Sequence, residues 1–111
     1  MTTPITIELG DIADIYPLTI PTTAVTQSIQ TGMIMLHGWS IANPSATTAG
    51  EIDVYNGDDA NGQLAAGIIV PASDSKTHFM GLPGILLDVG LAVDVALAGM
   101  VGVLWVSRPA Q

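Results

Sequence analysis

Apolar and polar side chains alternate with a two-residue period in several short stretches of this chain, most clearly in residues 51–55 and 91–97. This period is the one expected of a β-strand with a single buried face. Prolines and glycines separate these stretches at short, fairly regular intervals, as in proteins built of many short strands. The pattern therefore predicts an all-β protein, specifically an antiparallel, jelly-roll-like β-sandwich with an extended N-terminal arm.

The same alternation predicts which side chains face the core. In the expected strand over residues 33–42, one face carries Met33, Met35, His37, Trp39 and Ile41, and the other carries Ile34, Leu36, Gly38, Ser40 and Ala42. A helix over residues 85–106 stays open as an alternative because Leu and Ala favour helices. The β-branched residues and the glycine spacing of residues 85–106 favour strands instead. The core residues expected from the pattern are Ile52, Val54, Leu91, Val93, Val95 and Val103.

The last expected strand, Met100–Val106, is apolar on both faces. A strand of this kind is either central in a sheet or covered by a neighbouring subunit.

The chain is long enough for one domain, and we expect it to divide at residue 31. Residues 1–31 form the expected arm: 5–9 alternates as a strand, 16–21 lies between prolines, and 22–31 is polar. Residues 32–111 form the expected sandwich. We expect the arm and two tryptophans to contact neighbouring subunits or a partner. The interface residues expected on this basis are Ile5, Ile7, Leu9, Tyr16, Leu18, Ile20, Trp39 and Trp105.

Charge excludes several partners. Ten acidic residues against two Lys and Arg give a net charge of −8. Nucleic acid is excluded as a direct partner because phosphate binding needs clustered cations, and an anionic membrane surface is disfavoured for the same reason. Asp88 and Asp94 argue against a membrane span over residues 85–106. The N-terminus has no signal-peptide pattern, so we expect a soluble chain made in the cytoplasm.

Catalytic motifs are weak. A Ser-His-Asp triad could be drawn from Ser40 with His37 or His78, but 38–42 does not have the pattern of a nucleophile elbow. We expect His37 to be a packed or interface histidine and His78 to lie on a surface strand. Glu51 and Asp53 share a strand face, yet the sequence has few aromatic residues to line a glycosidase cleft. No enzyme activity is expected.

Cofactor and metal motifs are equally sparse. The chain has no cysteine, and its single lysine, Lys76, is not part of a phosphate-binding loop. Residues 53–61 supply several Asp and Asn oxygens, but their spacing does not fit an EF-hand. A solvated turn is the favoured interpretation, and a non-standard calcium site stays open. No cofactor is expected.

A string of strands and turns over residues 33–107 resembles the small β-sandwich virion proteins of tailed bacteriophages that decorate or cement a capsid. The resemblance implies symmetric assembly, often as a trimer, on an icosahedral shell. The segments that carry it are Gly38–Ser45, Glu51–Gly57, Gly67–Pro71, Pro83–Leu87, Gly90–Val95 and Gly102–Val106.

We therefore expect a non-enzymatic protein on the exterior of a virion, made in the host cytoplasm. Its expected partners are further copies of itself, as a homotrimer, and the major capsid protein of a phage. Two alternatives remain. One is a carbohydrate- or receptor-binding module, with Trp39, Tyr55 or Tyr16 exposed. The other is a small hydrolase that uses His37 or His78.

Overall fold

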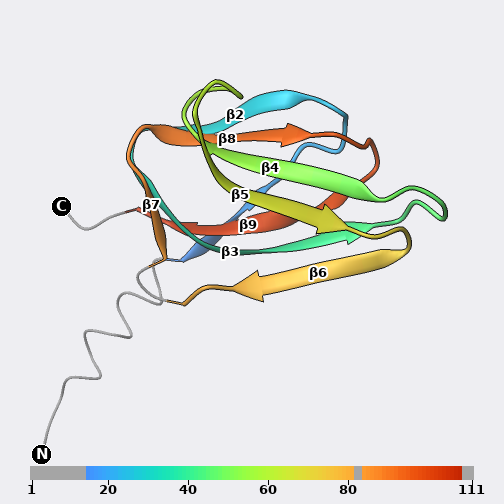
Figure 1. Ribbon diagram of the computed structural model, residues 1–111. Coiled ribbons are helices and arrows are strands. Elements are labelled where there is room, and N and C mark those ends of the chain that lie inside the picture. Colours follow the sequence, from blue (N-terminus) through green and yellow to red (C-terminus); the bar gives the residue numbers. More distant parts are fainter. Residues whose placement is uncertain (1–14, 82–83, 109–111) are drawn as a thin grey trace, which may run out of the picture.

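The computed structural model describes residues 15–81 and 84–108. Nine strands and no helix occur within these residues, and the strands lie in two layers (Figure 1). None of the described residues therefore forms a helix that could cross a membrane. The strands are β1 (Tyr16–Thr19), β2 (Thr26–Thr31), β3 (Ile34–Asn43), β4 (Gly50–Asn56), β5 (Gln63–Val70), β6 (Asp74–Phe79), β7 (Ile85–Leu87), β8 (Gly90–Val95) and β9 (Val101–Ser107).

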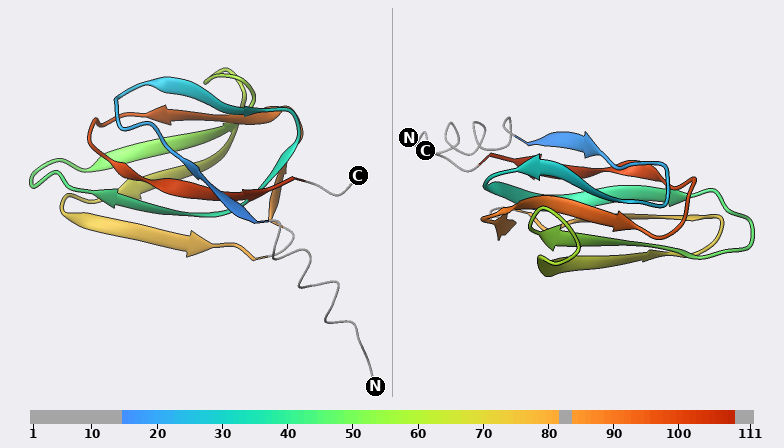
Figure 2. Two further views of the ribbon diagram at one scale, coloured as in Figure 1. Left: turned by 180° about the vertical axis from the view of Figure 1, so that it is seen from behind. Right: turned by 90° about the horizontal axis from the view of Figure 1, so that it is seen from above.

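The two layers are antiparallel sheets that pack face to face (Figure 2). Sheet A has the order β1-β9-β3-β6, and the short β7 pairs with residues 34–36 of β3. Because β9 occupies one edge of β3, β6 and β7 both pair with its other edge, one after the other along the strand. Sheet B has the order β2-β8-β4-β5. The predicted antiparallel β-sandwich is thus confirmed.

The strand pairs are nested in the sequence. The hairpin β4·β5 lies innermost, and β3·β6, β2·β8 and β1·β9 enclose it in turn. Successive pairs belong to alternate sheets, which is the winding of a jelly roll. The jelly-roll-like topology expected from the sequence is therefore present, and residues 85–107 form strands rather than the alternative helix.

The core lies between the sheets. Ile52, Val54, Leu91, Val93 and Val95 are buried as predicted. Val103 is not part of this core: it is half-buried on the outer side of sheet A, and its neighbour Leu104 is buried instead. The alternation could not assign the faces of β9 because both faces are apolar. The buried apolar set is Ile20, Ile34, Leu36, Ile41, Ile52, Val54, Ile68, Val70, Leu87, Leu91, Val93, Val95, Met100, Leu104 and Val106.

The uninterrupted alternation of two faces expected over residues 33–42 is wrong. Ile34 and Leu36 are buried at the start of the strand, whereas Ile41 is buried near its end. An irregularity between Leu36 and Gly38 in the pairing with β9 inserts one residue and reverses the alternation. Local sequence does not reveal this bulge, because either face of the segment could be buried.

The boundary expected at residue 31 does not hold for the residues that the structure describes. β1 pairs with β9 in sheet A, and β2 pairs with β8 in sheet B. Ile20, between them, is buried in the core. The polar sequence of β2 lacks a core pattern, yet it joins the sandwich because an edge strand needs few apolar residues. The earlier part of the expected arm, with Ile5, Ile7 and Leu9, lies outside the described residues.

Candidate functional site

The outer face of sheet A is apolar. Cross-strand partners share a face, so Trp105 opposite Gly38 and Val103 opposite Ser40 point away from the core. Val101 is 48% exposed and Phe79 is 56% exposed. Among the described residues, no strand residue on this side carries a charge, and its polar members are the uncharged Thr19, Ser40, Ser75 and Thr77. We call this surface the apolar face; its members are Met35, Phe79, Leu86, Val101, Val103 and Trp105.

The outer face of sheet B is acidic. Asp53 lies directly opposite Asp94 in the pairing of β4 with β8, and Glu51 is two residues from Asp53 on the same side. A hydrogen bond with the Asp53 carboxyl and repulsion from Asp53 and Asp94 raise the pKa of Glu51. Partial burial raises the pKa of Tyr55, and the same three carboxylates add to the effect. We call Glu51, Asp53, Tyr55 and Asp94 the acidic face.

The acidic face does not form a metal centre. Within the ranges 15–81 and 84–108, no group of three or more His, Cys, Asp or Glu side chains is placed to hold a metal ion. The Thr26 hydroxyl donates a hydrogen bond to Asp94 Oδ1 at 3.1 Å. This contact ties β2 to β8 across the face.

The Asp- and Asn-rich segment between β4 and β5 is a hydrogen-bonded turn. The backbone N–H of Asn61 donates to Asp59 Oδ1 at 2.9 Å, and that of Gly62 donates to the Asp59 carbonyl. The Asn56 amide group donates to Asp88 Oδ1 at 2.7 Å, and its carbonyl oxygen accepts from the Val89 N–H at 2.9 Å. The Asp59 oxygens thus accept hydrogen bonds within the turn, whereas the Asn56 side chain bonds to the turn between β7 and β8.

His37 is a packed histidine at the bulge of β3 and is only 2% exposed. Its Nδ1 lies 3.2 Å from the Gly81 carbonyl oxygen, and its Nε2 lies 2.7 Å from Ser107 Oγ. Because a carbonyl only accepts, Nδ1 carries a proton, and in the neutral ring Nε2 accepts from the Ser107 hydroxyl. The ring also stacks on Phe79 with centroids 6.3 Å apart.

This serine–histidine pair is not the one that could be drawn from the sequence. Ser40 Oγ accepts a hydrogen bond from Trp105 Nε1 at 3.4 Å, whereas the serine that bonds to the His37 ring is Ser107. Sequence reasoning missed Ser107, which is 70 residues from His37. Ser107 is 8% exposed, so the hydrogen bonds of His37 form a buried clamp, that is, a buried connection that joins β3 to β9 and to Gly81.

β6 is the exposed edge of sheet A. All six of its residues are exposed, as expected for His78. Lys76 and His78 lie opposite Ile41 and Trp39, so they point toward the core side of the sheet. The ring of His78 lies 5.2 Å from that of Trp39. A charged residue that points inward on an edge strand discourages pairing with another chain.

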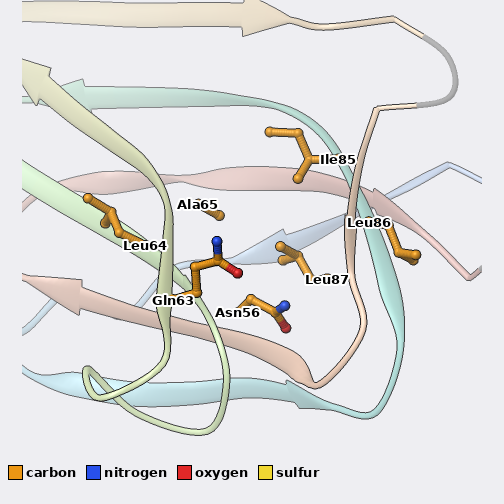
Figure 3. Close-up of a pocket in the computed structure, with 7 residues that line it drawn as sticks. All are labelled: Asn56, Gln63, Leu64, Ala65, Ile85, Leu86 and Leu87. Carbon is orange, nitrogen blue, oxygen red and sulfur yellow. The ribbon is translucent and has the colours of Figure 1, made fainter.

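β5 is the exposed edge of sheet B, and it differs from β6. Its eight residues include neither a charge nor a proline, and Leu64 and Ile69 are 56% and 62% exposed. Between the start of β5 and β7 lies a cavity of about 260 Å³. Ile85 and Leu87 point from β7 toward it, whereas Leu86 lies on the other side of that strand (Figure 3). The cavity is lined by Asn56, Gln63, Leu64, Ala65, Ile85, Leu86 and Leu87.

The expected interface residues that the structure describes do not form one surface. Tyr16, Leu18 and Trp39 are half-buried and pack against the core, and Ile20 is fully buried. Of these residues, only Trp105 lies on the apolar face. The sequence did not indicate Phe79, Leu86 and Val101 as members of this face, because their exposure depends on the sheet order. One signal in the sequence did point to such a face, namely that both sides of β9 are apolar.

A comparison of the chain with models of protein families, with curated proteins and with solved structures finds no match.

Proposed function

We propose that this chain is a non-enzymatic structural protein that decorates or cements the exterior of a phage capsid as a homo-oligomer. The observation that carries the proposal is the apolar face: an uncharged sheet surface on a chain with a net charge of −8. Its partners are further copies of itself and the major capsid protein. Neither nucleic acid nor a membrane is a direct partner.

The apolar face favours self-association. Phe79, Leu86 and Val101 are each about half exposed, and burying apolar surface is worth roughly 25 cal/mol per Å². Monomers rarely leave contiguous apolar patches larger than a few hundred Å² in water. Contact through this face also keeps the acidic faces of two copies on opposite sides of the assembly. The like charges then stay far apart.

The capsid location is supported by analogy and by charge. Jelly rolls recur in viral capsid and lectin domains, which is an argument from fold alone. The resemblance of residues 33–107 to capsid decoration proteins implies a trimer on the virion exterior. The acidic face would suit basic sites on a shell, and its charge would keep the protein away from the packaged genome.

The first test is the mass in solution and the binding to purified phage shells. Val101→Glu places a charge on the apolar face, and we expect it to dissociate the oligomer and to abolish shell binding. Val25→Glu is the matched control because Val25 is 37% exposed and lies before β2, away from that face. A Val101→Glu protein that keeps the oligomeric mass would contradict the proposal.

The alternative is a carbohydrate- or receptor-binding module. The half-buried Trp105 indole on the outer side of sheet A is the observation that favours it, since aromatic rings stack on sugars. In that case the protein would be a monomer that does not bind phage shells. It would bind glycans with quenching of tryptophan fluorescence, and Trp105→Ala would abolish this binding.

A further inference from the structure

We propose that the free edge of β5 receives residues 5–9 of a neighbouring copy as an added strand, whose aliphatic side chains enter the cavity between β5 and β7. This inference rests on the proposed homo-oligomer and adds a second contact between its copies, besides the apolar face.

β5 is the edge strand with the fewest features that oppose pairing. β1 contains Pro17, which cannot donate a ladder hydrogen bond. β2 is polar and has a bulge between Ser28 and Gln30. β6 turns Lys76 toward the core side. β5 also has a bulge, at Ala65, but it carries neither a charge nor a proline, and its residues 66–70 pair regularly with β4.

The cavity fits the side chains of such a strand. A strand added to β5 would extend sheet B over the open side of the sandwich, and alternate side chains would point between the sheets. Leu64, Ala65, Ile85 and Leu87 give the cavity apolar walls, and Asn56 and Gln63 add polar ones. A cavity of about 150 Å³ already holds a benzene molecule, so the 260 Å³ here has room for an aliphatic side chain.

The chain itself carries a segment of matching pattern. Ile5, Ile7 and Leu9 alternate with Thr6 and Glu8 ahead of β1. Strand addition of this kind combines backbone hydrogen bonds with pockets for alternate side chains. Six residues, 10–15, connect Leu9 to β1 and span up to about 20 Å when extended. That length is sufficient to leave the sandwich of origin.

The position of β1 suits such a contact. Tyr16 pairs with Val106, which pairs with Leu36 opposite Ile85, so β1 begins at the same end of the sandwich as the cavity. In the proposed homo-oligomer, the β5 edge of the next copy is the partner of the segment that precedes β1.

This contact is head-to-tail, because the N-terminal segment of one copy meets the β5 edge of the next. Head-to-tail contacts close into rings, as a trimer requires.

The test exploits the absence of cysteine from the chain. Full-length Ile7→Cys and Leu64→Cys, carrying tags of different mass, are mixed and treated with a short bis-maleimide crosslinker. We expect a mixed two-chain product, identified by mass spectrometry. Thr47→Cys replaces Leu64→Cys in the control, since Thr47 is exposed between β3 and β4, at the end of the sandwich away from Leu64, and the product should then be lost. Ile7→Asp should also lower the oligomeric mass measured by light scattering.

Three outcomes would overturn the inference. Crosslinking of the double variant Ile7→Cys/Leu64→Cys within one chain would place the segment on its own β5. An oligomer that gives no mixed product removes the inference and leaves the proposed function standing. A parent protein that is monomeric at all concentrations removes both.

Discussion

The two outer faces of this sandwich are made by strands of the same kind but have opposite chemistry. On sheet A, β9 places Val101, Val103 and Trp105 outside, whereas on sheet B, β4 places Glu51 and Asp53 outside. Both sheets bury the alternate residues of these strands in one core. The inner residues of a strand therefore determine the fold, and the outer residues are free to determine what each face contacts.

The largest expected effect separates inner from outer positions. Val93 is fully buried, so Val93→Asp leaves an unpaired charge in the core, which costs several kcal/mol, and the domain should unfold. Val101→Asp on the apolar face should keep the domain folded, because Val101 is 48% exposed. Circular dichroism and thermal melting compare the two variants. Equal melting temperatures would break the distinction between the two sides of the sheets.

A smaller effect is expected at the end of the apolar face where His37 lies. His37→Ala removes a buried ring together with its contacts to Gly81 and Ser107, and we expect a loss of about 2–4 kcal/mol in the free energy of unfolding. His78→Ala is the control because His78 is exposed. Urea unfolding of both variants measures the difference. An equal loss in both would contradict the clamp described for His37.

The acidic face should become more stable when one of its charges is removed. Asp53 and Asp94 are direct cross-strand partners, and like charges in such pairs are destabilising by roughly 0.2–1 kcal/mol. Asp94→Asn keeps an acceptor for the Thr26 hydroxyl and should stabilise the domain by an amount in this range at low salt. The gain should fade at high salt, where the repulsion is screened. No gain at low salt would show that the two carboxylates do not repel measurably.

The smallest expected effect is a pH dependence of the acidic face. The pKa of Glu51 is raised in the folded state, above its ordinary value of 4.5. Its contribution to stability is therefore fully present below pH 4.5 and is lost as the pH rises through the folded-state pKa. Glu51→Gln should remove this part of the decline. Melting temperatures from pH 4 to pH 7 compare parent and variant, and identical slopes would argue against the coupling.

Particular residues show how much of this could be predicted. The alternation at Ile52, Val54 and Val93 predicted the fold class and most of the core, because apolar residues at every second position fit only a strand with one buried face. The same rule failed for Val103, where both faces are apolar. It failed again along β3, where one inserted residue exchanges the faces. Neither the His37–Ser107 contact nor the cavity has a local signal, since each joins segments distant in the chain.

By itself, the sequence determined that this protein is built of short strands, that those strands wind into a sandwich, and that its surface is strongly acidic. These properties follow from local periodicity and from composition. Only the tertiary structure decided that sheet A carries the apolar face, that sheet B carries the acidic one, and that the uncharged β5 lies at an edge. The reason is physical: the strand order and the bulge determine which side of a strand meets the core, and both arise from contacts between residues far apart in the chain.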